Sequence, residues 1–274
     1  MNTGIRKLGL LVATAALWFV GAAVLMPQMA AANAPQIDPT SCGAGAGPIS
    51  DYCSFEDTGE NVVIAHGSCN VQGACVPLGN GTRIGHDSCN GGLACAGAGT
   101  SGGSSSIGND SCNEREACGS AGEGGSSSIG NGSCNERGAC VDAGADGKSS
   151  IGNGSCNASF ACSGAGASGS SSINNNSCNG EHACDGAGAS GGSSSINNNS
   201  CNGEHACDGA GTSGGSSSIG NGSCNEDYAC YQAAYDGGRS KIGNRSCNAE
   251  ANPGICNNVG ANGGSSVIGN NKKN

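Results

Sequence analysis

Residues 173–195 read Ile-Asn-Asn-Asn-Ser-Cys-Asn-Gly-Glu-His-Ala-Cys-Asp-Gly-Ala-Gly-Ala-Ser-Gly-Gly-Ser-Ser-Ser, and Ile196 begins the same pattern again. The stretch holds one isoleucine, a polar turn, a Ser-Cys-Asn triplet and an Ala-Cys pair, followed by a return rich in glycine and serine. The units Cys178–Ser200 and Cys201–Ser223 differ at only three positions. Such near identity indicates growth by duplication, so the repeated unit decides the fold.

The unit recurs along most of the chain at a nearly constant period. Nine Ser-Cys-Asn triplets follow one another every 20 to 23 residues, and an isoleucine stands five residues before each triplet cysteine. This period, with its turn residues, predicts an all-β, disulfide-stapled β-solenoid (β-helix) of about nine 22–23-residue coils. The recurring isoleucines are Ile64, Ile84, Ile107, Ile129, Ile151, Ile173, Ile196, Ile219 and Ile242.

Each coil is expected to contain short strands joined by turns. The Ser-Ser-Ser-Ile stretch (126–129 in one unit) and the Ser-Cys-Asn stretch (133–135) are predicted as very short strands. Gly-Asn-Gly at 130–132 separates them as a turn, because glycine and asparagine tolerate positive φ. The variable residues after the triplet, such as 114–116, are expected at a solvent-facing corner. Stacking places each residue on its copy, and asparagine amides both donate and accept along such ladders.

The 20 cysteines are expected to be oxidised in an exported chain. Stacked coils would hold cysteines about 4.8 Å apart, so bridges between coils are possible as well as bridges within them. We favour pairing within coils, because each duplicated unit is then self-sufficient. The expected pairs are Cys69–Cys75, Cys89–Cys95, Cys112–Cys118, Cys134–Cys140, Cys156–Cys162, Cys178–Cys184, Cys201–Cys207 and Cys224–Cys230, with Cys247–Cys256 and Cys42–Cys53 at the two ends.

The bridges matter because the expected core is thin. Ordering a residue costs roughly 1–2 kcal/mol, while burying one isoleucine per coil returns only about 1.5–3 kcal/mol. Closing a seven-residue loop with a disulfide adds about 2–2.5 kcal/mol per unit on the chain-entropy view. The cysteines are therefore expected to contribute a large share of the stability.

A Cys-x5-Cys bridge in every coil resembles the disulfide-laddered β-helix of beetle antifreeze proteins. The resemblance covers the cysteine spacing and an adjacent Ser or Ala, and it implies a β-helical architecture. Those proteins have shorter coils and carry a Thr-x-Thr row that contacts ice. This chain has no Thr-x-Thr, and its repeats contain only Thr82, Thr100 and Thr212. The resemblance therefore supports the fold rather than ice binding.

The N-terminus has the pattern of an export signal. Arg6 and Lys7 precede an apolar stretch from Leu8 to Met26, and cleavage is expected after Ala32. The long apolar run leaves an uncleaved membrane anchor open as the alternative. We expect a signal peptide at 1–32, an N-terminal cap segment at 33–63, the repeat solenoid at 64–268 and a polar tail at 269–274. Either way, the repeats would be extracellular, secreted or at the cell surface.

Charge and composition exclude several kinds of function. The net charge is −10, and loss of the signal removes two basic residues and no acidic one, which makes it −12. A chain this acidic cannot neutralise a phosphate backbone, so no nucleic acid partner is expected. The carboxylates lie at scattered corner positions that recur only because the unit recurs, so we expect no catalytic site. These corner residues are Glu114, Glu116, Glu136, Glu181, Glu204 and Glu226.

Histidines and sequons also have structural interpretations. His66 and His86 occupy a position that holds asparagine in later units, so we interpret them as ladder variants. The strongest metal candidate is Glu-His-Ala-Cys-Asp at 181–185, which recurs at 204–208. We favour the interpretation of that pattern as a duplicated surface corner, and we expect no metal and no cofactor. Asn-x-Ser or Asn-x-Thr sequons occur in almost every unit and leave N-glycosylation open as an alternative. We favour a structural interpretation, in which a turn asparagine is followed by a ladder serine.

Together these features favour a non-enzymatic, secreted or cell-surface structural or adhesive repeat protein whose partner is an unidentified matrix or surface component. One alternative is a protein that binds ice or another crystal surface through a row such as Ser127, Ser149 and Ser171. The second alternative is a β-helical carbohydrate-active enzyme. A membrane is expected to be involved only if the signal stays uncleaved.

Overall fold

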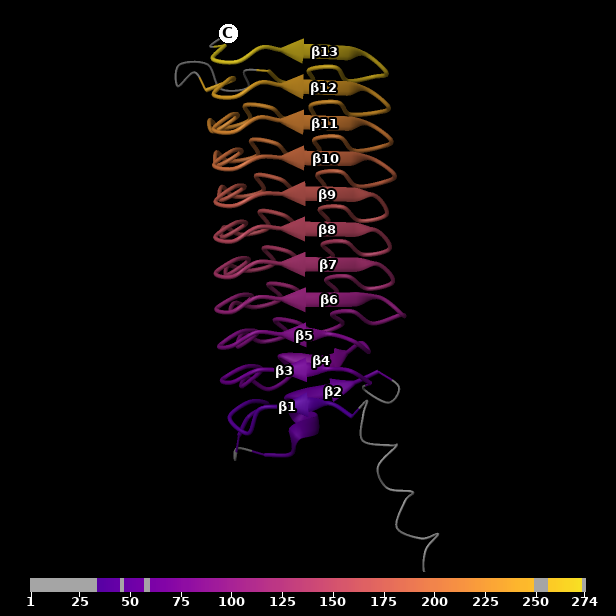
Figure 1. The fold of residues 1–274 in the computed structure, drawn as a ribbon, viewed down its shortest axis with the longest axis vertical. Coiled ribbons are helices and arrows are strands. Elements are labelled where there is room, and N and C mark those ends of the chain that lie inside the picture. Colours follow the sequence, from indigo (N-terminus) through magenta and orange to yellow (C-terminus); the bar gives the residue numbers. More distant parts are fainter. Residues whose placement is uncertain (1–33, 45–46, 57–59, 249–255, 273–274) are drawn as a thin grey trace, which may run out of the picture.

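The computed structural model describes residues 34–44, 47–56, 60–248 and 256–272. These residues form a parallel β-solenoid in which each coil stacks on the one before (Figure 1). One strand from each coil joins an 11-stranded parallel sheet, in the order β1-β3-β5-β6-β7-β8-β9-β10-β11-β12-β13. The predicted fold class is therefore confirmed.

The strands of this sheet are short and regular. Eight consecutive strands have four residues each, and β2 and β4 pair separately as a two-stranded sheet near the N-terminal end. The elements are β1 (Gln36–Ile37), the 3-10 helix η1 (Ile49–Asp51), β2 (Cys53–Phe55), β3 (Val63–Ile64), β4 (Cys75–Leu78), β5 (Arg83–Ile84), β6 (Ser104–Ile107), β7 (Ser126–Ile129), β8 (Lys148–Ile151), β9 (Ser170–Ile173), β10 (Ser193–Ile196), β11 (Ser216–Ile219), β12 (Arg239–Ile242) and β13 (Ser265–Ile268).

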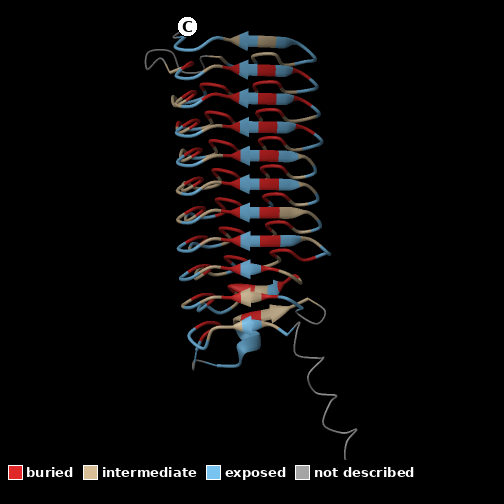
Figure 2. Ribbon diagram, in the orientation of Figure 1, coloured by how far each residue is buried: buried red, intermediate tan, exposed pale blue. Residues whose placement is uncertain are grey.

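Strand register follows the repeat residue for residue. Ile129 pairs with Ile151, and Ile151 pairs with Ile173, so the isoleucines form one continuous ladder. Side chains alternate between the two faces of a strand, and the fourth residue of each faces inward. Figure 2 shows this alternation as red and pale blue bands across the sheet.

In the regular coils, the buried hydrophobic side chains other than isoleucine are small. Each coil adds two cysteines and two alanines, for example Ala139 and Ala143 in the coil that contains β7, and these are fully buried. The return segment passes close to the sheet, which requires glycine. At Gly144, whose φ is 74°, a Cβ would collide with the carbonyl oxygen of Ser126. The return segment can pass this close to the sheet because glycine has no side chain at the point of contact.

The Ser-Cys-Asn stretch is not a strand, so the prediction of two or more strands in every coil was wrong. Each triplet cysteine has φ between 55° and 58°, in the left-handed region. That conformation turns the chain and prevents the alternation of an extended strand. Serine side chains complete the ladder instead: the Ser133 N–H donates to Ser111 Oγ (3.2 Å), and Ser133 Oγ donates to the Gly152 carbonyl (2.8 Å).

The ends of the rod differ from its middle. At the N-terminal end Val62 and Leu78 are fully buried, and β2 pairs with β4. At the C-terminal end the segment predicted as a tail still takes part in a coil, since the Cys247 N–H donates to the Lys272 carbonyl (2.9 Å). The predicted signal at 1–32 lies outside the described residues. Among the described residues, no helix has the length and apolar character needed to span a bilayer.

Candidate interaction surface

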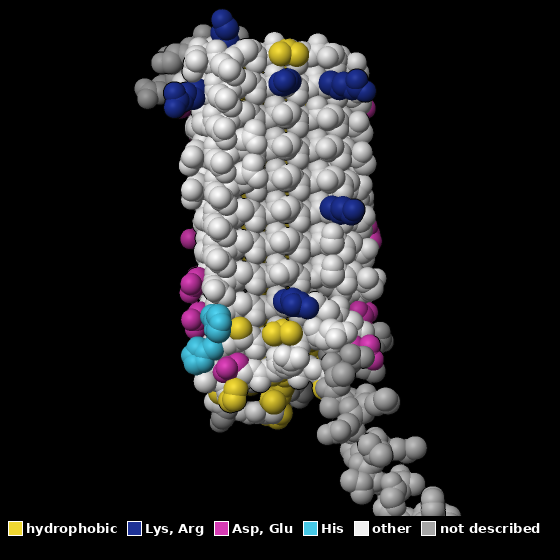
Figure 3. All heavy atoms as spheres, in the orientation of Figure 1, with side chains coloured by type: hydrophobic (Ala, Val, Ile, Leu, Met, Phe, Trp, Pro, Cys, Tyr) yellow, Lys and Arg dark blue, Asp and Glu magenta, His cyan; other side chains and the backbone are white. Residues whose placement is uncertain are grey.

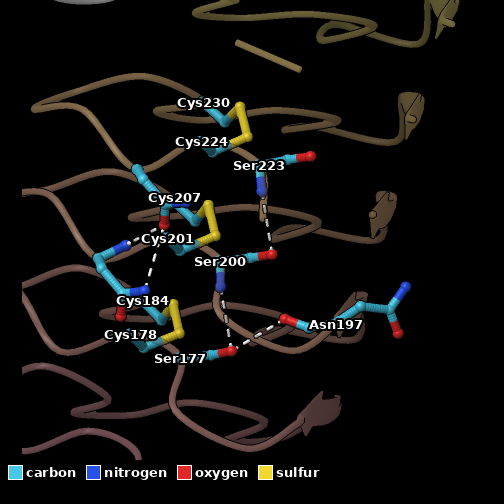
Figure 4. The surroundings of a disulfide bond; sticks show 12 residues. Ser177, Cys178, Cys184, Asn197, Ser200, Cys201, Cys207, Ser223, Cys224 and Cys230 are labelled. Carbon is cyan, nitrogen blue, oxygen red and sulfur yellow. Dashed lines mark hydrogen bonds between the residues drawn. A yellow bond between two sulfur atoms is a disulfide. The ribbon is translucent and has the colours of Figure 1, made fainter. Parts of the chain in front are cut away.

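The disulfides form a column along the inside of the rod. Figure 4 shows three stacked bridges, Cys178–Cys184, Cys201–Cys207 and Cys224–Cys230, beside the ladder of Ser177 and Ser200. All ten bridges have Cα–Cα distances between 5.6 and 6.0 Å, and the cysteines of the repeat units pair within one coil. No cysteine in the described part is free. So many bridges are consistent with an oxidising, extracellular environment.

The bridges of the structure are Cys42–Cys53, Cys69–Cys75, Cys89–Cys95, Cys112–Cys118, Cys134–Cys140, Cys156–Cys162, Cys178–Cys184, Cys201–Cys207, Cys224–Cys230 and Cys247–Cys256. In the described residues, the groups of three possible metal ligands that lie close together are composed of these cysteines. Their sulfur atoms are already bonded to one another. They are therefore not available as thiolate ligands.

The two predicted metal-candidate histidines lie in a stack of rings at one corner. His182 and His205 are parallel, with ring centroids 4.9 Å apart, and Phe160 and Tyr228 continue the stack on either side at 5.5 and 5.0 Å. Arg137 lies over the Phe160 ring at 5.8 Å. The lone pairs of parallel imidazoles do not converge, so this arrangement does not place two nitrogens around one ion.

Each of these histidines has an aspartate partner in its own coil. His182 Nδ1 lies 3.0 Å from Asp185 Oδ2, and His205 Nδ1 lies 2.9 Å from Asp208 Oδ2. Burial raises the pKa of Asp208, the His205 hydrogen bond opposes that rise, and the charge of Asp185 adds to it. The residues at 181–185 and 204–208 thus form a repeated structural corner, with their rings packed on each other.

The turn asparagines and sequon serines have structural roles. The Asn131 N–H donates to Asn153 Oδ1 (2.7 Å) in the next coil, which forms an asparagine ladder along the turn. His86 joins this ladder, because its backbone N–H donates to Asn109 Oδ1 (2.9 Å). Ser133, the hydroxyl residue of one sequon, is fully buried in the serine ladder described above. The ladder explains the repeated Asn-x-Ser pattern.

The outer side of the 11-stranded sheet is a regular surface that runs along the rod. We call the outward first and third residues of β6–β13, together with Arg83, the serine face. Each of its two rows contains six serines, and β5–β13 keep them in register. Its exposed basic side chains are Arg83, Lys148, Arg239 and Lys241. Figure 3 views this face, with Lys and Arg in dark blue on a mostly uncharged surface.

The row Ser127, Ser149 and Ser171, predicted as a possible ice-contacting row, faces inward. These serines are only 3–5% exposed, because they stand two residues before an inward isoleucine. The period of two along a strand could have revealed this from the isoleucine positions alone. The outward residues of those strands include Ser128, Ser150 and Ser172.

The inward serines form a ladder of unsatisfied hydroxyls, which the sequence analysis missed. Each Oγ is buried and has no hydrogen-bond partner. Buried hydroxyls normally have partners, so these positions carry a cost in stability. The residues concerned are Ser105, Ser127, Ser149, Ser171, Ser194, Ser217 and Ser240.

The fold and the disulfide column define a disulfide-rich β-solenoid repeat protein. Comparison with family models finds that residues 119–199 are similar to a family described as a domain of unknown function (DUF7640). The matched stretch contains β7 to β10, which are regular coils of the rod. No curated protein and no solved structure matches the chain.

Proposed function

We propose that this protein is a non-enzymatic structural or adhesive rod that acts outside the cell, either secreted or held at the cell surface. The supporting observation is the unbroken register of β5–β13, which repeats outward serines in most coils. A surface of that kind offers many equivalent contacts rather than one pocket. Ten disulfides suit the oxidising conditions outside the cell.

The charged groups support a role without catalysis. Catalytic acids and bases have to converge on one reacting atom. The corner glutamates of this chain are instead spread along the rod from Glu114 to Glu226, with at most two in any coil. At 181–185 and 204–208, each histidine contacts the aspartate of its own coil, and the two histidine rings stack on each other.

Deletion of one coil tests this function. Removing Cys201–Ser223, a near copy of the preceding unit, should shorten the rod by about 4.8 Å, the spacing of adjacent strands. Retention on the surface of the secreting cells should then fall only in proportion to the lost coil. Length is measured by small-angle X-ray scattering, and retention by washing and quantifying the bound protein.

Single substitutions provide the matched control. Glu181→Gln and His182→Asn change one corner without changing the coil number, so retention should stay at the level of the unmodified protein. If one of these substitutions removed nearly all retention while the coil deletion did not, binding would depend on one discrete site. That result would contradict the proposed function.

The flat array of hydroxyls supports a second candidate, the binding of an ordered crystal surface such as ice. Outward serines repeat about 4.8 Å apart across the sheet and about 6.6 Å apart along each strand. If this function holds, micromolar protein should produce thermal hysteresis, and Ser150→Tyr with Ser172→Tyr should abolish it. Ser159→Tyr, at a corner, is the control and should leave it intact. Protein without hysteresis at these concentrations removes this candidate.

A further inference from the structure

We propose that the serine face binds a linear anionic polysaccharide that lies along the rod axis. This inference rests on the proposed extracellular role and names the partner of the rod. The carrying observation is a segregation of charge. The chain has 21 acidic and 11 basic residues, yet every charged outward residue in the described strands of the 11-stranded sheet is basic.

The four cations of the face form no ion pair within the part of the chain that the structure describes. Arg83, Lys148, Arg239 and Lys241 are all exposed, and none makes a salt bridge with another described residue. In Figure 3 the acidic side chains lie along the lateral edges and toward the N-terminal end, away from the middle of the face. Negative edges beside a positive face would direct an anionic chain onto the sheet and away from the corners.

The spacing of the cations favours a long ligand. Arg83 and Lys241 stand in the same outward row, with six serines between them along β6–β11. Seven strand-to-strand steps separate them, which is about 34 Å. Lys148 lies between them in the neighbouring row. A compact anion would contact one of these positions, whereas an extended chain along the axis contacts all of them.

The hydroxyls between the cations favour a sugar polymer. Among the described residues, the outward serines of β6–β11 make no side-chain hydrogen bond, so each hydroxyl remains able to donate once and accept twice. Short side chains on a flat sheet let a polymer approach closely along its length. Duplex DNA carries one charge about every 1.7 Å, far denser than four cations over this distance. A polymer with many hydroxyls and fewer charges matches the face better.

Binding to defined polymers tests the inference. The secreted, oxidised protein is titrated with polygalacturonate, dextran sulfate, neutral dextran and duplex DNA in low salt. We expect binding to at least one of the two anionic polysaccharides, and none to dextran. Comparison of the affinities for polygalacturonate and dextran sulfate shows whether the face prefers carboxylate or sulfate groups. Because exposed ion pairs are screened, 0.5 M NaCl should release the polymer.

A charge-removed variant locates the contact. The variant Arg83→Ser, Lys148→Ser, Arg239→Ser and Lys241→Ser gives each position the residue that most neighbouring coils carry there, so its fold should be unchanged. Affinity should fall by roughly tenfold or more, since each exposed pair contributes a few-fold. The control Arg115→Ser, Arg137→Ser, Arg245→Asn and Lys272→Asn removes the same charge from outside the face and should keep affinity within about twofold.

Three results would overturn the inference. The first is that neither anionic polysaccharide binds. The second is that the face variant binds with the same affinity as the unmodified protein. The third is that DNA binds more tightly than either polysaccharide. The salt titration needs no variant, so it decides the question even if the face variant folds poorly. Each of these results leaves the coil-deletion test of the proposed rod function unaffected, so the two failures can be told apart.

Discussion

Two buried serines in one coil, Ser171 and Ser177, have opposite environments. Ser171 Oγ faces the core with no partner. Ser177 Oγ donates to the Asn197 carbonyl (2.8 Å) and accepts from the Ser200 N–H (3.3 Å), as Figure 4 shows. The same residue type therefore costs stability at one position and supports the coil ladder at the other. The difference comes from which side of the backbone each hydroxyl occupies.

Alanine substitution should separate these two roles. Ser171→Ala removes a buried, unpaired hydroxyl and should raise the free energy of unfolding by about 1 kcal/mol. Ser177→Ala leaves a backbone N–H and a carbonyl without partners and should lower it by about 1–3 kcal/mol. Guanidinium unfolding of the oxidised protein measures both. A decrease for Ser171→Ala would mean that its hydroxyl has a partner after all.

At the scale of the coil, the Ser-Cys-Asn corner has the greatest effect on structure. The triplet cysteine takes a left-handed conformation, which turns the chain, and its disulfide closes a loop of seven residues back onto the following Ala-Cys pair. The asparagine of the triplet caps the corner: Asn135 Nδ2 donates to the Asp110 carbonyl (2.8 Å) in the preceding coil. One strand, one bridge and two polar ladders thus replace the two-sided sheet packing of an ordinary β domain.

Removing one bridge measures its share of the coil's stability. Cys178→Ala with Cys184→Ala should lower the free energy of unfolding by about 2.4 kcal/mol, because the seven-residue loop regains its freedom in the unfolded chain. Ser195→Ala, outward in the next strand, is the control and should change little. Complete reduction of all bridges should lower the melting temperature sharply. An unchanged melting curve after full reduction would show that the ladders alone hold the coils.

At the scale of the whole molecule, the repeat produces a rod with distinct faces. The sheet face carries serines and cations, while the corners carry the acidic residues and the stacked rings of Phe160, His182, His205 and Tyr228. Because each coil contacts mainly its neighbours, stability and length should grow together with coil number. The same arrangement repeats an exposed residue of the unit as a row along the axis. A contact that is weak in one coil is therefore made many times along the rod.

Much of this organisation follows from the sequence by itself. The period of 20 to 23 residues determined the solenoid, since only stacked coils give every copy the same environment. The asparagine ladder followed from recurrence of asparagine at one position, including the substitution of His86. The N-terminal signal and the secretion that it implies stay predictions, because residues 1–32 lie outside the described part.

Other features were decided only by the tertiary structure. Nothing in the Ser-Cys-Asn triplet itself marks a left-handed corner, which the structure combines with a bridge and with ladders to the neighbouring coils. The inward position of Ser171, the stack of His182 on His205, and the grouping of four cations on one face depend on which side of the backbone each residue occupies. Residues such as Arg83 and Lys241 are far apart in the chain, and only strand register places them in one row.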